Sequence, residues 1–389
     1  MSQRPIITHL EVHEFEFEIQ DMIPNDRTGG IIYSPGTSGT FKNAVLQVHT
    51  DAGLSGEHVV SFLANLAAIP MFAKQLVGQN ALERERLYQS TKFTQRGLSG
   101  ISTGVVDCAL WDIAGKYYNA PVYELLGGYR KRLTAYASTY HGDEEIGGLN
   151  SPEAYADFAE QCLELGYKAF KIHGWEEGPV EREIKVVQAV RDRVGDRMML
   201  MNDPACAINT FGDAWRVGRA CDEAGFFWLE DPFKDGGLSI HAHRKLRQKI
   251  KTPLLVSEHV NLLEPTIDFA MADATDFVRA DTDYDGGITG VMKIAHAAEG
   301  LGLDTEVHLV GPARRHCIAS IRNANFYEMG LVHPRGGFYG PPIFNNGYRD
   351  ALDAIDADGC VSVPEGPGLG VQLDWDYIRR RRTAHAVYD

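Results

Sequence analysis

Four carboxylates and two histidines recur along the chain, each at the end of an apolar run and 23 to 30 residues from the next. In chain order they are His173, Asp203, Glu230, Glu258, Asp281 and His308. The interval is close to the length of one strand-plus-helix unit. In an eight-stranded parallel barrel, successive strands deliver side chains to one rim, and active sites are built there. We therefore expect these six side chains to meet at one site.

Three of the acids, Asp203, Glu230 and Glu258, each follow directly on a buried strand pattern. A single buried carboxylate is usually explained by a helix cap or a salt bridge, because burial is costly without a partner. Three on consecutive strands instead predict a site of hard oxygen ligands, as Mg²⁺ prefers, with Mn²⁺ as a substitute. Oxygen donors alone argue against zinc. His308 and Asp281, on later strands, would supply acid–base chemistry opposite the metal.

The elements that position these groups can be predicted from the alternation of apolar runs. From Leu133 onward, short apolar runs alternate with amphipathic helical patterns over residues 151–165, 181–194 and 288–301. Such alternation indicates βαβ units and a parallel sheet. About eight runs are typical of strands, from LTAYAST at 133–139 to NFYE at 325–328.

The amino-terminal part has a different character. An alternating run near residue 7 and a second at 44–49 predict strands with one covered face, and residues 60–118 turn helical. Between the two strands, residues 21–40 are rich in Gly, Pro, Ser and Thr and predict a mobile loop. We expect an α+β domain over 1–128, a barrel over 129–355 and a segment over 356–389 that returns to the first domain.

Composition narrows the class of protein. The chain has 389 residues and a formal net charge of −15, and its one basic run is Arg379–Arg382, so nucleic acid is not an expected partner. The six cysteines are scattered and contain no CxxC pair, which predicts reduced, mostly buried thiols. No secretory signal or membrane-spanning stretch is evident. We expect a soluble, cytoplasmic protein with no membrane partner.

Several ordered fragments resemble the enolase superfamily, and within it the mandelate racemase/muconate lactonizing enzyme subgroup. They are GVVDCALWDIAGKYYNAPVYELLGG (104–128), then FKIH, MNDP, WLEDP, SEH, RAD, EVH and VPEGPGLGV. The resemblance implies a (β/α)₇β TIM-like barrel with an amino-terminal α+β capping domain completed by the carboxyl-terminal segment. It also implies removal of the proton α to a carboxylate, with the resulting enolate stabilised by Mg²⁺.

The resemblance assigns roles to individual residues. Asp203, Glu230 and Glu258 match the metal ligands, His308 the catalytic histidine and Asp281 the acid that orients it. Glu328, in NFYE, matches a group that hydrogen-bonds the substrate carboxylate, and we expect it to be protonated. Lys171 and His173 occupy the family's Lys-x-Lys motif.

His173 departs from the family pattern, because many members have a second lysine there that acts as a base. A neutral histidine can also act as a base, so either His308 or His173 is a candidate for this role. Racemisation needs bases on both faces of the substrate. The Lys-x-His pattern therefore favours a dehydratase of a sugar acid, an aldonate or aldarate, that yields a 2-keto-3-deoxy acid.

Substrate contacts are expected from the capping loop at Arg27 and Tyr33, and from His259 beside the third ligand. The substrate class is a small hydroxy-carboxylate, and the resemblance implies a homo-oligomer such as a dimer or octamer. A racemase or epimerase and a lactone cycloisomerase remain alternatives. A non-catalytic metal-binding relative and an unrelated metal-dependent barrel hydrolase are further ones.

Overall fold

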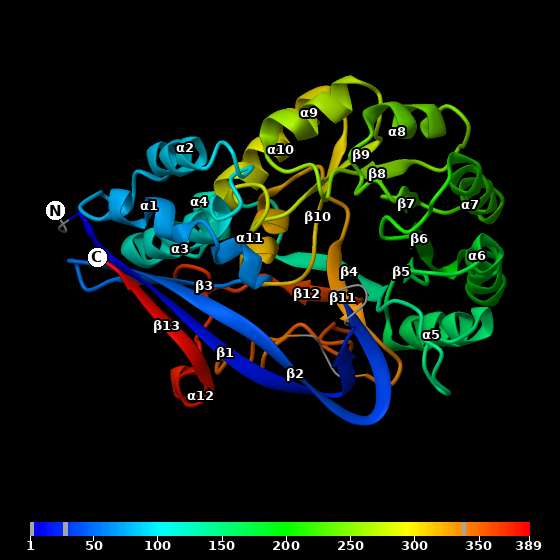
Figure 1. The fold of residues 1–389 in the computed structure, drawn as a ribbon, viewed down its shortest axis with the longest axis horizontal. Helices are drawn as coiled ribbons and strands as arrows, with labels where there is room; N and C mark the ends of the chain where they lie inside the picture. Colours follow the sequence, from blue (N-terminus) through cyan, green and yellow to red (C-terminus); the bar gives the residue numbers. More distant parts are fainter. Residues whose placement is uncertain (1–3, 26–29, 337–339) are drawn as a thin grey trace.

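A closed barrel of eight parallel strands forms the centre of the computed structural model, which describes residues 4–25, 30–336 and 340–389 (Figure 1). The strands pair in chain order, and the last pairs with the first to close the ring. They are β4 (Arg132–Thr139), β5 (Ala169–His173), β6 (Met199–Asp203), β7 (Trp228–Glu230), β8 (Leu254–Val256), β9 (Phe277–Ala280), β10 (Asp304–Val307) and β11 (Tyr327–Val332).

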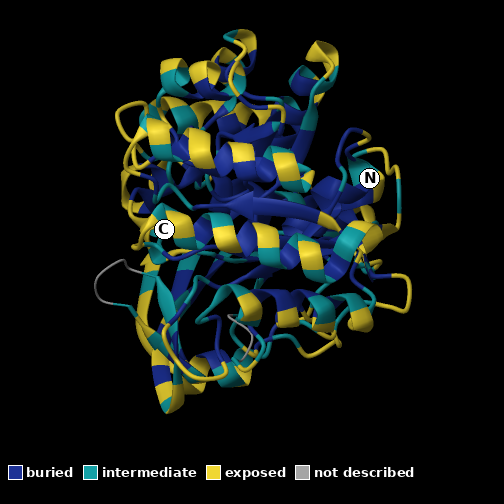
Figure 2. Ribbon diagram, turned by 90° about the vertical axis from the view of Figure 1, so that its right-hand side faces the viewer, coloured by how far each residue is buried: buried dark blue, intermediate teal, exposed yellow. Residues whose placement is uncertain are grey.

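One α-helix follows each of the first seven barrel strands, so the predicted (β/α)₇β architecture is confirmed. The helices are α5 (Pro152–Leu165), α6 (Val180–Val194), α7 (Phe211–Ala224), α8 (Ile240–Arg247), α9 (Leu263–Met271), α10 (Gly287–Leu301) and α11 (Pro312–Ser320), with a short 3₁₀ turn η2 (Gly195–Arg197) after α6. Most of them turn one side to the strands and the other to solvent, as the alternating colours of the outer ribbons show (Figure 2), whereas α11 has no exposed residue. Local chemistry fixes their ends: the Ser151 side chain accepts from the Ala154 amide, and Gly166 ends the same helix in the left-handed conformation.

The capping domain pairs an antiparallel sheet with a layer of helices. The sheet order is β13 (Arg382–Tyr388), β1 (Ile7–Pro24), β2 (Ile31–Thr50) and β3 (Ser55–Val59). Alternate residues such as Leu10 and Val12 pack into a core that includes Ile69 and Val105. The helices are η1 (Leu63–Leu66), α1 (Ile69–Leu76), α2 (Arg84–Thr94), α3 (Thr103–Tyr118) and α4 (Val122–Leu125), and α12 (Trp375–Arg380) precedes β13.

The prediction of a mobile loop over residues 21–40 is wrong for most of that range. Strands β1 and β2 continue as a paired ribbon, with Met22 opposite Tyr33 and Gln20 opposite Ser38. Glycine allows the close approach of the two strands, because a Cβ at Gly39 would lie 2.2 Å from the Met22 carbonyl oxygen. The glycine-rich composition that predicted a loop therefore allows a tight, irregular pairing of two strands.

The carboxyl-terminal segment touches both parts of the molecule. Strand β12 (Cys360–Ser362) pairs antiparallel with β4 of the barrel, and β13 pairs antiparallel with β1 of the capping sheet. The division of the chain at residues 128 and 355 stays a prediction.

All six cysteines are free thiols, and four of them are buried. Within the described ranges, no helix combines the length and hydropathy needed to cross a bilayer.

Helix α3 docks against the barrel at a glycine. A Cβ at Gly104 would lie 2.3 Å from the Thr282 carbonyl oxygen and 2.7 Å from that of Asp283, just beyond the end of β9. The capping domain therefore approaches the rim backbone to backbone.

We expect Gly104→Ala to destabilise the protein by about 1–3 kcal/mol, because the added methyl group forces α3 away from the rim. The measurement is the thermal unfolding midpoint by calorimetry. Gly300→Ala is the matched control, since Gly300 also lies in a helix but nothing approaches its added Cβ; its midpoint should stay the same or rise. Equal midpoints for the two variants would contradict this account of the interface.

Candidate active site

Three carboxylates converge at the carboxyl ends of neighbouring barrel strands. Asp203 ends β6, Glu230 ends β7 and Glu258 lies two residues beyond β8. One oxygen from each lies within 4.8 Å of the others. Asp203 and Glu230 are buried, and Glu258 is partly exposed. Their all-oxygen donor set suits a hard divalent cation such as Mg²⁺.

Two buried cations lie among these acids. The Lys171 ammonium is 3.0 Å from Asp203 Oδ2, 2.9 Å from Glu230 Oε2 and 3.0 Å from Glu328 Oε1. Arg279 Nε is 3.0 Å from Glu230 Oε1, and its Nη2 is 2.6 Å from Glu328 Oε2. Counting Glu258, four carboxylates face two cations, which leaves two negative charges. A bound divalent ion would balance them.

The pKa shifts follow from this arrangement. Burial raises the pKa of Glu230 even though Arg279 and Lys171 lower it. Burial also acts on Lys171, but the surrounding carboxylates, Glu230 and Glu328 foremost, hold its pKa well above the usual range. Lys171 therefore stays charged and cannot accept a proton near neutral pH. An additional cation beside Glu230 would favour its ionised form.

Glu328 is held as a carboxylate, which contradicts its expected protonated state. Besides the Lys171 and Arg279 contacts, it accepts a hydrogen bond of 2.7 Å from the Leu309 amide. Burial opposes ionisation, but Arg279 and Lys171 hold its pKa well below the usual range. All its partners are hydrogen-bond donors, so a protonated Glu328 would have no acceptor among them. It organises the cations rather than donating.

His308 and Asp281 form a hydrogen-bonded pair on the other side of Glu258. His308 Nδ1 is 2.9 Å from Asp281 Oδ2, and its Nε2 is 3.3 Å from Glu258 Oε1. Arg314 Nη2 donates to both oxygens of Asp281, at 3.0 and 2.9 Å, and the ring of Tyr284 stacks on His308 with centroids 6.1 Å apart. Asp281 therefore fixes Nδ1 as the protonated nitrogen and leaves Nε2 directed toward the carboxylates.

Charge surrounding the pair shifts both groups. Burial raises the pKa of Asp281, but Arg314 and His308 lower it below its ordinary value. Burial lowers the pKa of His308, but Glu258 and Asp281 raise it above 6.5 overall. The environment thus favours an imidazolium next to an ionised aspartate, which is the state that a base reaches after taking a proton.

His173 lies beside Asp203, at a different carboxylate from His308. Its Nε2 is 2.9 Å from Asp203 Oδ2, and its Nδ1 is 2.7 Å from the Thr139 carbonyl oxygen. The carbonyl can only accept, so Nδ1 carries a proton. The ring of His141 lies 5.2 Å away, centroid to centroid, and adds a second imidazole at this side of the rim.

The predicted substrate contacts are less central. Arg27 lies outside the described residues. Tyr33 is buried on β2 and packs on His333, with ring centroids 4.4 Å apart, just beyond β11. The His259 side chain is 44% exposed, and its Nε2 is 3.7 Å from Glu258 Oε1. Of the two described residues, His259 is thus the one that lies directly against a member of the carboxylate trio.

Sequence reasoning missed three residues of this site. Asp231, directly after Glu230, is buried with neither carboxylate oxygen hydrogen-bonded, and burial together with Glu258 raises its pKa well above the usual range. Its position directly after Glu230 in WLEDP could have identified it from the sequence. Arg314 and Tyr284 reach the dyad from α11 and from the loop after β9, and no local pattern marks them.

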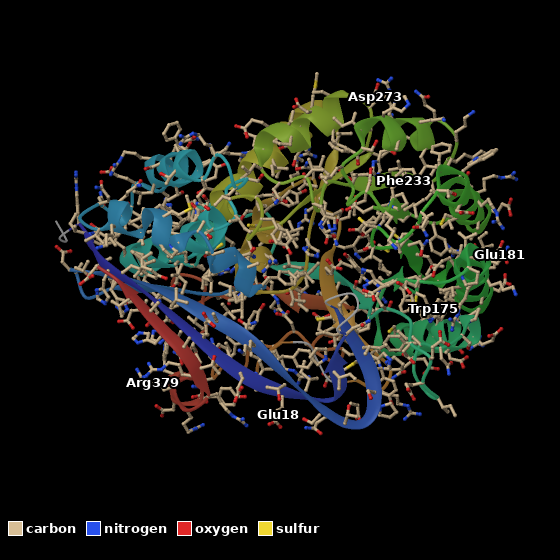
Figure 3. All side chains as sticks on the ribbon, in the orientation of Figure 1. Glu18, Trp175, Glu181, Phe233, Asp273 and Arg379 are labelled. Atoms are coloured by element: carbon tan, nitrogen blue, oxygen red, sulfur yellow. The ribbon has the colours of Figure 1, made fainter. Side chains whose placement is uncertain are left out.

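A cavity of about 300 Å³ opens beyond the barrel rim, lined largely by residues at or near the starts of α6 and α7. Trp175, Pro204 and Lys234 are among the residues that line it, beyond the ends of β5, β6 and β7. Trp175 is labelled on this side of the barrel in Figure 3. Among the described residues, none of Asp203, Glu230 and Glu258 lines this cavity, so it is not the carboxylate site itself.

Comparison with known proteins gives the family. Residues 154–377 match the enolase C-terminal domain-like model, and residues 21–127 match the mandelate racemase/muconate lactonizing enzyme N-terminal domain model. The chain belongs to this family. Members of the mandelate racemase/muconate lactonizing enzyme family share the barrel and capping domain described above, and the chain is an enzyme of this group.

Individual relatives differ in the reaction their names state. The chain is 28% identical to an arabinonate dehydratase of Saccharolobus solfataricus over 302 residues, 74% of each chain. It is also 28% identical to a D-galactarolactone cycloisomerase of Agrobacterium fabrum, over 87% of this chain and 91% of that one. A structure of D-glucarate dehydratase from Agrobacterium tumefaciens complexed with magnesium superposes with a TM-score of 0.86 at 31% identity, covering 98% and 100% of the two chains.

Replacing Asp281 by Asn should lower the pKa of His308, because a neutral amide no longer stabilises the imidazolium. The measurement is an NMR titration of the His308 ring in metal-free buffer. A histidine with a raised pKa stabilises the fold fully below its unfolded value, near 6.5, and this stabilisation disappears as pH rises through the folded value. Asp281→Asn should therefore lose stability mainly on the acid side of that window. An unchanged His308 pKa would contradict the role given to Asp281.

Proposed function

We propose that this chain is a Mg²⁺-dependent dehydratase of a sugar acid, an aldonate or an aldarate. The observation that carries the proposal is the His308–Asp281 pair beside Asp203, Glu230 and Glu258, with Nε2 of His308 directed at the trio. A divalent cation held by the three carboxylates would stabilise the negative charge that develops on the substrate carboxylate during the reaction. Names of relatives that act on arabinonate and glucarate support a polyhydroxylated acid as the substrate.

His308 is the stronger candidate for the base. Both imidazoles have a carboxylate of the trio beside Nε2, and a cation bound there would cancel much of that influence. The partner of Nδ1 then distinguishes the two rings: His308 Nδ1 faces the ionised Asp281, whereas His173 Nδ1 faces the neutral Thr139 carbonyl. An ionised partner stabilises the imidazolium far better than a neutral one. His308 therefore keeps its basicity in the loaded site.

Dehydration follows from a single histidine acting twice. His308 Nε2 takes the proton from the α-carbon, and the electron pair of that C–H bond moves toward the carboxylate. The resulting imidazolium then gives its proton to the hydroxyl on the β-carbon, which leaves as water. The enol that remains tautomerises to a 2-keto-3-deoxy acid. Lys171 and Arg279 hold the surrounding carboxylates in place and remain charged throughout.

A lactone cycloisomerase is the second candidate, because the D-galactarolactone cycloisomerase is as similar to this chain as the arabinonate dehydratase. It would use the same proton abstraction without loss of water. An epimerase would further need His173 to act on the opposite face of the substrate. Product mass and isotope content separate these reactions.

The first experiment is an NMR screen of an aldonate and aldarate library in D₂O, with Mg²⁺ and then with excess EDTA. We expect one or a few acids to give a 2-keto-3-deoxy product, and EDTA to abolish the reaction. Deuterium uptake at the α-carbon without loss of water would contradict dehydration. Turnover that survives complete removal of divalent ions would contradict the metal assignment.

Substitution of the two histidines assigns the base. His308→Asn should lower the rate of dehydration by about 10²–10⁴-fold, the range typical of a positioned base, while Mg²⁺ binding measured by calorimetry persists. His296→Asn, which alters an exposed histidine on α10, should leave the rate within a few fold. If His173→Ala stops dehydration and His308→Asn does not, the roles of the two histidines are reversed.

A further inference from the structure

Four histidines surround one glutamate on the capping sheet, outside the barrel site. Because strand residues alternate between faces, His9, Glu11 and His13 of β1 share one face, opposite the one that packs on α1 and α3. The register adds His49 of β2 beside His9 and His385 of β13 beside His13. Strand β13 lies along β1 at the edge of the sheet (Figure 1).

Each oxygen of Glu11 faces one pair of imidazoles. Oε2 lies 3.0 Å from His13 Nε2 and 2.9 Å from His385 Nε2, and these two rings stack with centroids 4.5 Å apart. Oε1 lies 3.3 Å from His9 Nε2 and 3.7 Å from His49 Nε2, and that pair stacks with centroids 4.3 Å apart. Stacking directs the Nε2 atoms of each pair toward a common point.

Of the four imidazoles, His13 is the one with neither ring nitrogen in an ordinary hydrogen bond, whereas His49 lacks one at Nε2 alone. It is 5% exposed and packs against Trp375, whose ring centroid is 5.0 Å away. Nε2 is directed at Glu11 and the Gln47 side chain lies beside the ring, but neither ring nitrogen has a hydrogen bond of ordinary geometry among the described residues. A buried polar atom without a partner is costly, and proteins rarely leave one without a reason.

We propose that Glu11, His13 and His385 bind a transition-metal ion, with Zn²⁺ the best match. Two imidazoles and one carboxylate form a donor set typical of Zn²⁺, whereas Mg²⁺ prefers oxygen alone. Bonds of about 2.0–2.1 Å in a tetrahedron separate neighbouring ligand atoms by roughly 3.3 Å, close to the spacings between Glu11 and the two rings. Solvent completes the coordination, because Glu11 and His385 are partly exposed.

The consequence is a metal-mediated link between strands β1 and β13. Glu11 and His13 lie on β1 and His385 on β13, which is an edge strand. An ion shared by the two strands stabilises the folded protein in proportion to its occupancy, because the unfolded chain does not hold these ligands together. The site is independent of the reaction proposed for the barrel.

The test titrates Co²⁺, a spectroscopic substitute for Zn²⁺, into the intact metal-stripped protein while excess Mg²⁺ occupies the barrel. We expect one ion per chain with visible absorption of tetrahedral type, bleached by one equivalent of Zn²⁺, and a rise in thermal midpoint with Zn²⁺. His385→Gln should abolish the absorption and the rise. His9→Gln, the matched control in the other pair, should retain both.

Four outcomes overturn the proposal. The first is an undiminished Co²⁺ spectrum in His385→Gln, and the second is loss in His9→Gln with retention in His385→Gln. The third is loss of the spectrum in Glu258→Gln, which would place the ion in the barrel. Because His13 is buried, His13→Gln is judged by the bound metal per folded chain after gel filtration; retention of the ion there also overturns the proposal.

Discussion

The structure depends on the balance of buried charge inside the barrel. Lys171 and Arg279 project into the interior, where each contacts both Glu230 and Glu328. Removing one member of such a network would leave an uncompensated charge, which is far more costly than losing a contact. Beneath it, an aromatic layer that includes Trp228 closes the barrel. The two cations do not fully balance the acids, and a bound divalent ion would make up this deficit.

The dyad is coupled to the capping domain through Asp283. This buried acid accepts from the Ser61 amide and lies 2.8 Å from His58 Nε2 on β3. Arg314, which holds Asp281, also donates to the Ser61 hydroxyl. The pKa of Asp283 lies below its ordinary value, because His58 and Arg314 outweigh the effect of burial. The orientation of the His308–Asp281 pair is thus linked to the docking of the capping sheet, which lies far away in sequence but adjacent in space.

The sequence was sufficient for features governed by local periodicity. Alternating strands and helices predicted the barrel, and carboxylates at strand ends predicted which side chains would meet, since parallel strands align their carboxyl ends. The sequence was insufficient where long-range contacts decide the direction or the protonation state of a side chain. Nothing near Arg279 indicates that it points inward, and the protonation of Glu328 depends on donors from three other elements. The ribbon over residues 21–40 was misjudged because glycine permits close strand approach as readily as it permits a loop.

The asymmetry between the two imidazoles limits the reaction this rim can support. His308 is hydrogen-bonded to an ionised acid that Arg314 keeps ionised, so it can take up a proton and hold it until a leaving group needs it. His173 has a neutral carbonyl behind it and a carboxylate in front, which suits donation to a substrate oxygen better than abstraction from carbon. A site in which one imidazole has an ionised acid behind it and the other has a carbonyl would favour elimination, where a single histidine removes and returns the proton. Racemisation would require a base on each face of the substrate, and no second ionised acid lies behind Nδ1 of His173 in the part of the chain described.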